Sequence, residues 1–218
     1  MKESVSSFLG NVLSVILGIA ITFTIQGIIN RSQDRKAVRS ALELVRSELQ
    51  TNMDDVVTLS DYLAQERASA QYFLDHRNGL DACPADSVIY HSGVLFADVS
   101  ITLSNDALEL LKMSSLFQKL GDSGLSMKII RAYDSCESAA SNINRHIEAR
   151  DERFEKSVLE NSAAALGSGG VLSMKDLLRT GYGLYSVRWL TSQTDPESLT
   201  DIGDVRDALA AIDAFLKR

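Results

Sequence analysis

The sequence predicts an all-α protein, in which an N-terminal transmembrane helix continues into an antiparallel bundle of long helices with one irregular connector. Three observations support this fold class. The 218-residue chain contains only 2 prolines, which leaves long stretches free to form helix. An uncharged, largely apolar stretch lies near the N-terminus, and two later stretches repeat apolar residues with the period of an α-helix.

The uncharged stretch runs from Phe8 to Ile29 and contains 22 residues. As a helix it would be about 33 Å long, enough to cross a hydrocarbon core of about 30 Å. A cleaved signal peptide would have a shorter apolar run of about 7–15 residues, a basic front and a small-residue cleavage site. Since none of these features is present, we expect an uncleaved single span, with residues 1–30 as the anchor.

The residues after the span predict its orientation. Four basic residues follow it within ten positions, against one acidic residue, Asp34. By the positive-inside rule this excess keeps the C-terminal side in the cytoplasm, so we expect a single-pass protein of the cell inner membrane. The same cations could also hold membrane lipid through anionic headgroups, at about 1 kcal/mol each. These juxtamembrane basic residues are Arg31, Arg35, Lys36 and Arg39.

Small and polar residues recur every four positions within the span and therefore share one helix face. Such a face lets two helices approach closely and hydrogen-bond, which predicts self-association. The alternatives are that these residue types are simply common in membrane helices, or that the stripe lines an oligomeric pore. The residues of this face are Gly10, Ser14, Gly18, Thr22 and Gln26.

Beyond the basic residues, aliphatic side chains recur in two seven-residue series, which predict one long helix from about Asp34 to Leu74. Leu44, Met53 and Val57 widen the apolar stripe beyond a two-stranded seam, as expected in a bundle. The first series comprises Val38, Val45, Asn52 and Leu59, and the second Leu42, Leu49, Val56 and Leu63.

Asn52 is the one polar residue among these eight positions. A buried asparagine in such a seam can fix the register of a dimer by pairing with its mate. Alternatively, Asn52 bonds to another helix of the same bundle or lies at its edge.

The remainder divides into a connector, a second long helix and a group of shorter helices. In the connector, residues 78–104, the segments 88–90 and 99–101 could be short extended pieces. Ser104 then resembles the N-cap of a helix from Asn105 to Lys119 that ends at Gly121. We expect residues 31–166 to form the long-helix bundle and residues 167–218 a C-terminal helical subdomain packed on it. The expected later helices are Ser123–Leu166, with apolar steps of three and four from Leu125 to Ile147, then Ser173–Arg179, Leu184–Thr191 and Leu199–Lys217.

Catalytic motifs are weak. Gly121-Asp122-Ser123-Gly124 matches the tetrad around a trypsin-like nucleophile, but that chemistry requires a β-barrel and a matched His and Asp. A helix N-cap explains the tetrad better. The glycine-rich segment 167–170 lacks the Lys and Ser/Thr of a phosphate-binding loop, so it is interpreted as a helix terminator.

Metal and redox chemistry have little support. No histidine pair has the spacing of a helical metal site, and the acidic residues 151, 152 and 155 near His146 are interpreted as a solvated face. Cys136 is expected to be a reduced core residue, and it would pair with Cys83 only if the domain faced outside. Trp189, Tyr182 and Tyr185 are expected to be packing residues. We therefore predict no cofactor, no metal and no enzymatic activity.

Three blocks of the sequence resemble a bacterial family of uncharacterised single-span inner-membrane proteins, catalogued as a domain of unknown function. They are the span followed by Arg31-Ser-Gln-Asp-Arg-Lys36, the helix carrying Glu48, Leu49 and Asn52, and the segment from Ser104 to Tyr133. The chain lacks the Asn-Asn-Trp-Asn-like segment that such proteins often carry after the span. The resemblance covers residues 8–135 and implies the architecture but no activity.

These observations together predict a non-enzymatic interaction or scaffold subunit, anchored in the inner membrane, that self-associates and positions or regulates a protein partner. The net charge of −7 argues against a general nucleic-acid partner. An outward-facing sensor that signals through the span, and an oligomeric pore-forming subunit, are the alternatives.

Overall fold

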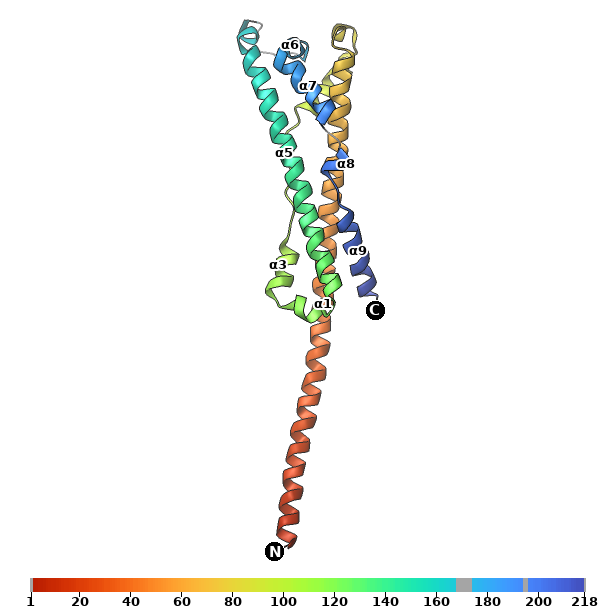
Figure 1. The fold of residues 1–218 in the computed structure, drawn as a ribbon, viewed down its shortest axis with the longest axis vertical. Coiled ribbons are helices and arrows are strands. Elements are labelled where there is room, and N and C mark those ends of the chain that lie inside the picture. Colours follow the sequence, from red (N-terminus) through yellow and green to blue (C-terminus); the bar gives the residue numbers. More distant parts are fainter. Residues whose placement is uncertain (1, 168–173, 194–195, 218) are drawn as a thin grey trace.

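The computed structural model describes the backbone of residues 2–167, 174–193 and 196–217, and the side chains of residues 32–159, 174–192 and 198–217. Two long helices dominate it. Helix α1 (Lys2–Asp75) has 74 residues, which corresponds to about 110 Å. Helix α5 (Ser123–Gly167) has 45 residues and runs antiparallel beside the second half of α1 (Figure 1). The all-α class and the antiparallel packing of long helices are thus confirmed, and the N-terminal part of α1 extends beyond the bundle.

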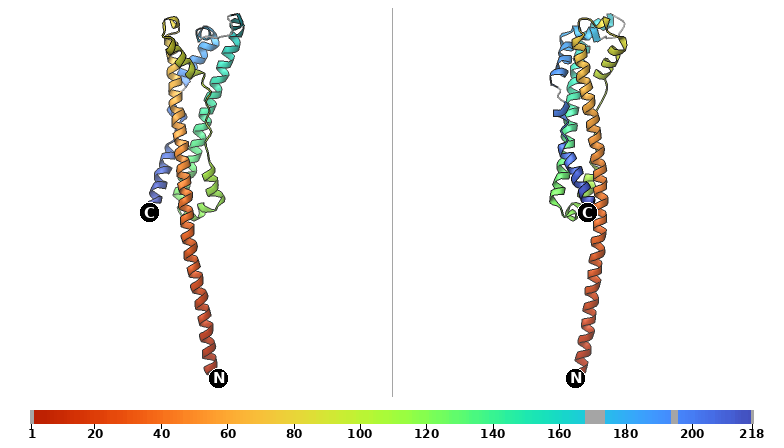
Figure 2. Two further views of the ribbon diagram at one scale, coloured as in Figure 1. Left: turned by 180° about the vertical axis from the view of Figure 1, so that it is seen from behind. Right: turned by 90° about the vertical axis from the view of Figure 1, so that its right-hand side faces the viewer.

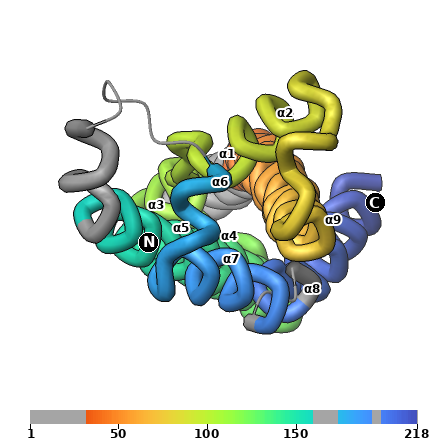
Figure 3. Tube along the Cα trace, turned by 90° about the horizontal axis from the view of Figure 1, so that it is seen from above, coloured from red at the N-terminus to blue at the C-terminus, as the bar shows by residue number. Residues whose placement is uncertain are grey.

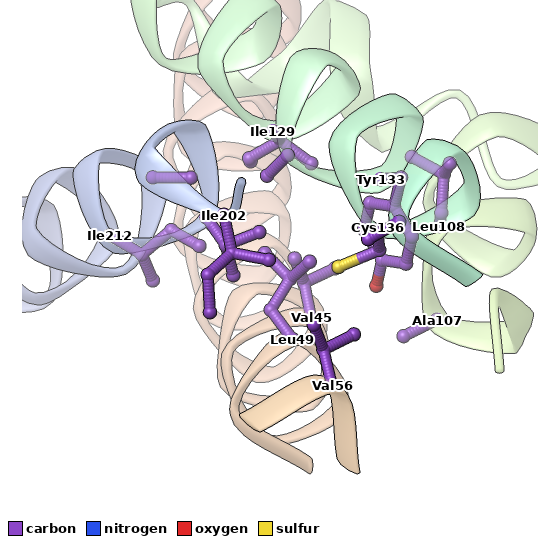
Figure 4. Packing of buried hydrophobic residues seen from close by; sticks show 14 of the residues in the cluster. Val45, Leu49, Val56, Ala107, Leu108, Ile129, Tyr133, Cys136, Ile202 and Ile212 are labelled. Carbon is purple, nitrogen blue, oxygen red and sulfur yellow. The ribbon is translucent and has the colours of Figure 1, made fainter. Parts of the chain in front are cut away.

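The core lies along the two seven-residue series of α1. Leu42, Leu49 and Val56 have no exposed surface, nor has Ile129 on the facing side of α5. Figure 4 shows side chains from α1 and α5 meeting Ile202 and Ile212 of the C-terminal segment around this seam. The periodicity that predicted the long helices is therefore the pattern of their burial.

The C-terminal helices pack against the two long helices at two places along the bundle. Helix α6 (Met174–Arg179) leads into α7 (Gly181–Gln193), which packs between α1 and α5 at the end where they diverge (Figures 1 and 3). The short helix α8 (Pro196–Leu199) follows, and α9 (Gly203–Leu216) packs against α5 and α1 nearer the point where α1 leaves the bundle.

The connector is more helical than predicted. A 3₁₀ turn, η1 (Leu80–Ala82), and helix α2 (Ala85–Leu95) follow α1, so the prediction of an extended segment at residues 88–90 was wrong. Pro84 is the N-cap of α2 and starts this helix. Residues 97–105 have no helix or strand, and they return along the bundle toward its base (Figure 2).

The predicted helix from Asn105 to Lys119 is two helices, α3 (Asp106–Met113) and α4 (Leu116–Leu120). Ser115 breaks it by adopting a left-handed conformation with φ of 59°. The Ser114 hydroxyl donates to the carbonyl of Leu110 at 2.5 Å and helps end α3. Gly121 ends α4 with φ of 68°, as its position suggested.

Several residues expected in the packed interior are exposed. Leu44 is 52% and Val57 41% exposed, so the apolar stripe of α1 is narrower than predicted. Tyr182 and Tyr185, also predicted to pack, are 51% and 54% exposed. They lie on the face of α7 directed away from the helices that it separates, since Val187 and Leu190 of the same helix are fully buried.

Within the residues searched, no helix is both long and apolar enough to cross a membrane. The side chains of residues 8–29, where the sequence predicts the span, lie outside the described part of the chain.

Candidate functional site

Two groups of polar side chains tie the connector to the long helices, and the first is centred on Glu48 of α1. Its carboxylate accepts hydrogen bonds from the Ser104 hydroxyl at 2.6 Å and from the Tyr133 hydroxyl at 2.5 Å. The backbone N–H of Ala107 donates to both oxygens at 3.1 Å. A side chain of another helix thus satisfies a free N–H group at the start of α3, the part normally played by a local N-cap.

These contacts shift two pKa values. Partial burial acts to raise the pKa of Glu48, but the hydrogen bonds from Ser104, Tyr133 and the backbone outweigh it, so the pKa is lowered. Burial, together with the carboxylate of Glu48, raises the pKa of Tyr133. Both groups therefore stay in the forms that bond to each other: Glu48 is ionised and Tyr133 is protonated.

Asn52 lies one turn beyond Glu48 and holds the same segment. Its amide nitrogen donates to the carbonyl of Ser104 at 2.7 Å, and its amide oxygen accepts from the Ser104 N–H at 3.2 Å. Asn52 is only 2% exposed. Its amide is thus bonded within the chain, but its partner is Ser104 of the non-helical connector and not another helix, as the sequence predicted.

Between these contacts lies a shallow groove of about 430 Å³. Leu44 of α1 and Leu110 of α3, each about half exposed, form its apolar rim. Glu48, Asn52 and Ser104 also line it, but Glu48 and Asn52 both bond to Ser104, so the exposed lining of the groove is mainly apolar.

The second group is a buried ionic cluster of Glu66 on α1 with His146 and Arg150 on α5. They are 0%, 7% and 1% exposed. Glu66 Oε1 lies 3.0 Å from Arg150 Nη1, and Glu66 Oε2 lies 2.7 Å from His146 Nε2. Removing a carboxylate from water costs free energy, and the contacts with Arg150 and His146 offset that cost for Glu66.

The remaining donors of Arg150 join the cluster to the connector. Its guanidinium donates to the Tyr62 hydroxyl at 2.7 Å, to the Ala97 carbonyl at 3.0 Å and to Asp151 at 2.7 Å. Tyr62 in turn donates to the carbonyl of Val94 at 2.7 Å. Burial acts to lower the pKa of Arg150, but Tyr62, Glu66 and Asp151 raise it above its ordinary value, so the guanidinium is charged.

Trp189 connects the cluster to α7. Its ring stacks on His146 with centroids 5.1 Å apart, and the guanidinium carbon of Arg153 lies 4.2 Å from the Trp189 ring centroid. The predicted packing role of Trp189 is confirmed. The cluster therefore joins α1, α5, α7 and the connector at the divergent end of the bundle.

The sequence interpretation missed Glu66 and Arg150, although both follow the predicted periodicity. Glu66 lies seven residues after Leu59, and Arg150 continues the steps of three and four that include Ile143 and Ile147. A charged residue at a core position of each long helix was the signal that could have paired them.

Other candidate chemistry takes ordinary structural roles. The side chain of Asp122 accepts from the N–H of Leu125 at 2.9 Å, so the Gly-Asp-Ser-Gly tetrad is a helix N-cap. Gly167 is the last residue of α5, and the rest of the glycine-rich segment, 168–170, lies outside the described residues. In the described part of the chain no group of three His, Cys, Asp or Glu could hold a metal ion.

The two cysteines are free thiols in different environments. Cys83 is partly exposed, whereas Cys136 is buried on the apolar face of α5. Burial raises the pKa of Cys136 to about 11. A thiol with that pKa is almost wholly protonated at neutral pH and therefore unreactive.

The predicted basic residues lie where α1 enters the bundle. Arg35, Lys36 and Arg39 are exposed. Arg39 donates to the carbonyl of Leu216 at the end of α9, at 2.5 Å. Arg31 and the predicted association face, Gly10, Ser14, Gly18, Thr22 and Gln26, belong to α1, but their side chains lie outside the described residues.

Comparison with family models, with curated proteins and with solved structures finds no match to this chain.

Proposed function

We propose that this protein is a membrane-anchored, self-associating helical scaffold that holds a protein partner at a fixed distance from the inner membrane, without enzymatic activity. The observation that carries the proposal is the continuity of α1, one helix from Lys2 to Asp75. The same helix contains the uncharged 22-residue stretch and, farther on, the buried seam of the bundle.

Continuity matters because no linker separates the predicted anchor from the bundle. A helix that leaves the bilayer without a break carries its direction and rotation into the domain that it supports. Such a connection suits a scaffold, which must present its surface in a defined orientation.

The helical phase of α1 is compatible with self-association through the span. Gly18 and Val45 are separated by 27 residues, or about 7.5 turns, so the two positions lie on opposite sides of an ideal helix. Val45 faces the bundle core and is fully buried. Ser47, about 8 turns from Gly18, lies on the same side as Gly18 and is exposed. Two copies could pair along the small-residue face while each bundle stays outside the pair.

Anchoring and self-association are tested together on the full chain. Vesicle flotation and resistance to alkaline extraction should show a membrane-embedded protein, whereas a chain recovered without lipid would contradict the anchor. In detergent, Gly18→Leu should reduce the oligomeric mass because the bulky side chain separates the helices. Ala20→Leu, a similar change about 200° around the helix, is the matched control. Equal masses for all three proteins would contradict association through this face.

The orientation is tested with Cys83, the partly exposed thiol. In intact cells, a membrane-impermeant maleimide should label it only after the inner membrane is permeabilised. Labelling before permeabilisation would place the bundle outside and favour the sensor-like alternative. Cys83→Ser is the control for the specificity of the label.

A further inference from the structure

A cavity of about 350 Å³ lies at the base of the bundle, where α1, α4 and α9 meet. Three of its lining residues are basic, and the other three are apolar. Among the residues whose side chains the structure describes, no acidic one lines it. The basic residues are Arg35, Arg39 and Lys119, and the apolar ones are Val38, Leu120 and Phe215.

The cations come from two helices that only the fold brings together. Arg35 and Arg39 are one turn apart on α1, and Lys119 is in the last turn of α4. The sequence therefore showed the α1 half of this group but not Lys119.

Arg39 and Lys119 both retain the capacity to bind an anion. Arg39 uses one N–H on the Leu216 carbonyl, and a guanidinium has five. Lys119 pairs with Asp34 at 2.8 Å, but the two side chains are 44% and 42% exposed. An ion pair so exposed contributes about 1 kcal/mol or less, so an incoming anion can displace it.

The position of the cavity fits an interfacial ligand. Arg35 is six and Arg39 ten residues beyond Ile29, the last residue of the uncharged stretch, which is about 9 and 15 Å along the helix. The headgroup region of a bilayer extends about 5–8 Å beyond each side of the hydrocarbon core. Long basic side chains extend toward the interface and cover the remaining distance.

We propose that this cavity binds the headgroup of an anionic phospholipid, with the phosphate held by Arg35, Arg39 and Lys119. The inference depends on the proposed membrane anchor, because only an anchored chain brings the cavity to the interface. Guanidinium groups match the geometry of phosphate oxygens. Phe215, Leu120 and Val38 offer an apolar wall to the glycerol and the upper acyl carbons. The arrangement is a lipid-specific site, beyond the general attraction of a basic segment to a charged surface.

The test uses the full chain in nanodiscs of mixed phosphatidylcholine and phosphatidylglycerol, followed by native mass spectrometry of the lipids that remain bound. The wild type should retain phosphatidylglycerol in preference to phosphatidylcholine. Lys119→Gln should reduce that preference about fivefold, as expected for the loss of about 1 kcal/mol. Arg39→Gln should reduce it at least as much.

Lys112→Gln is the matched control. Lys112, on α3, pairs with Glu109 at 2.9 Å and is 47% exposed, so its setting resembles that of Lys119, but it lies outside the cavity. If both lysine substitutions reduced the preference for phosphatidylglycerol equally, the preference would reflect general electrostatic attraction to an anionic surface, and the proposed site would be wrong. Phe215→Ser, which changes no charge, should weaken retention of phosphatidylglycerol; unchanged retention would overturn the apolar wall.

Two further outcomes separate this proposal from the anchor. A wild-type chain that fails to float with vesicles refutes the anchor itself. A chain that floats but retains both lipids equally refutes only the cavity. If inorganic phosphate or glycerol phosphate removes the retained lipid at low concentration, the cavity is a site for soluble phosphate, and the lipid assignment is wrong.

Discussion

At the scale of single residues, the interior of this bundle depends on a few buried polar groups that pair with one another. Arg150 is the largest fully buried side chain, and its charge is balanced by Glu66 and Asp151. A buried ion pair adds little stability over well-packed apolar residues, yet the loss of one member leaves an uncompensated charge. The cluster is therefore better interpreted as a device that fixes how α1, α5 and the connector fit together.

Replacing Arg150 alone should consequently be costly. Arg150→Met should lower the free energy of unfolding by about 3 kcal/mol, because Glu66 remains buried with only His146 as partner. Urea unfolding followed by circular dichroism measures this change. Arg145→Met, an exposed change on the same helix, should stay within about 0.5 kcal/mol. A double substitution, Glu66→Leu with Arg150→Met, should cost less than the sum of the two single changes; strict additivity would show that the pair is not coupled.

Glu48 should make the stability depend on pH. Its pKa is lower in the folded protein than in the unfolded chain, so its contribution is complete above the unfolded pKa of about 4.3 and is lost as the pH falls through the folded value. Glu48→Gln, which keeps the shape but loses the charge, should destabilise the protein by about 1–2 kcal/mol at neutral pH.

The two proteins should then converge in acid, because protonated Glu48 resembles glutamine. Urea unfolding of both at neutral pH and at about pH 3 measures the gap. Glu43→Gln, an exposed change on α1, controls for the loss of one surface carboxylate. A gap that stays constant across this pH range would mean that Glu48 acts through its shape alone.

At the scale of elements, the sequence predicted the helices that have a continuous apolar periodicity. It did not predict the helix breaks and caps that depend on local backbone conformation or on contacts between distant residues. The seams of α1 and α5 persist over many turns, so both helices were predicted nearly to their ends. The break at Ser115 was not predictable, because a left-handed serine carries no sequence signal comparable to glycine. Glu48 and Ser104 are 56 positions apart, and a cap supplied across that distance appears only in the folded chain.

The glycines of α7 also show that contacts between helices decide features that the sequence pattern does not predict. The sequence predicted a helix that begins only at Leu184, but Gly181 is the first residue of α7 and Gly183 lies inside the helix. A Cβ built on Gly183 would lie 1.9 Å from the carbonyl oxygen of Leu177, whereas one on Gly181 meets nothing within 4 Å. Gly183 is therefore required by the close approach of α7 to the end of α6.

Gly183→Ala should accordingly lower the free energy of unfolding by about 1–3 kcal/mol, the usual cost of overpacking. Gly181→Ala should be neutral or stabilising by up to about 1 kcal/mol, since alanine favours helix and no contact opposes it. Thermal unfolding of the two variants and the wild type provides the comparison. Equal effects would mean that α7 shifts freely against α6.

At the scale of the whole molecule, the bundle is long and narrow (Figures 1 and 2). The basic cavity is lined by residues of α1, α4 and α9, and the ionic cluster lies farther along α1 and α5, beside α7. From Ile29 to Asp75 the helix rises about 70 Å. In the proposed anchored protein, the distal end of the bundle therefore stands about 70 Å from the membrane.

This geometry predicts the distance of a natural label from the lipid. A fluorescent maleimide should react with Cys83, which packs beside the end of α1, and not with Cys136, whose pKa is about 11. Energy transfer from Cys83 to acceptor lipids in vesicles should be weak, because the helix holds the two about 70 Å apart. A label at the base, placed by Gln33→Cys in a Cys83→Ser background, should transfer strongly. Equal transfer from both positions would mean that the bundle lies down on the membrane, and a scaffold that projects its partner outward would then be excluded.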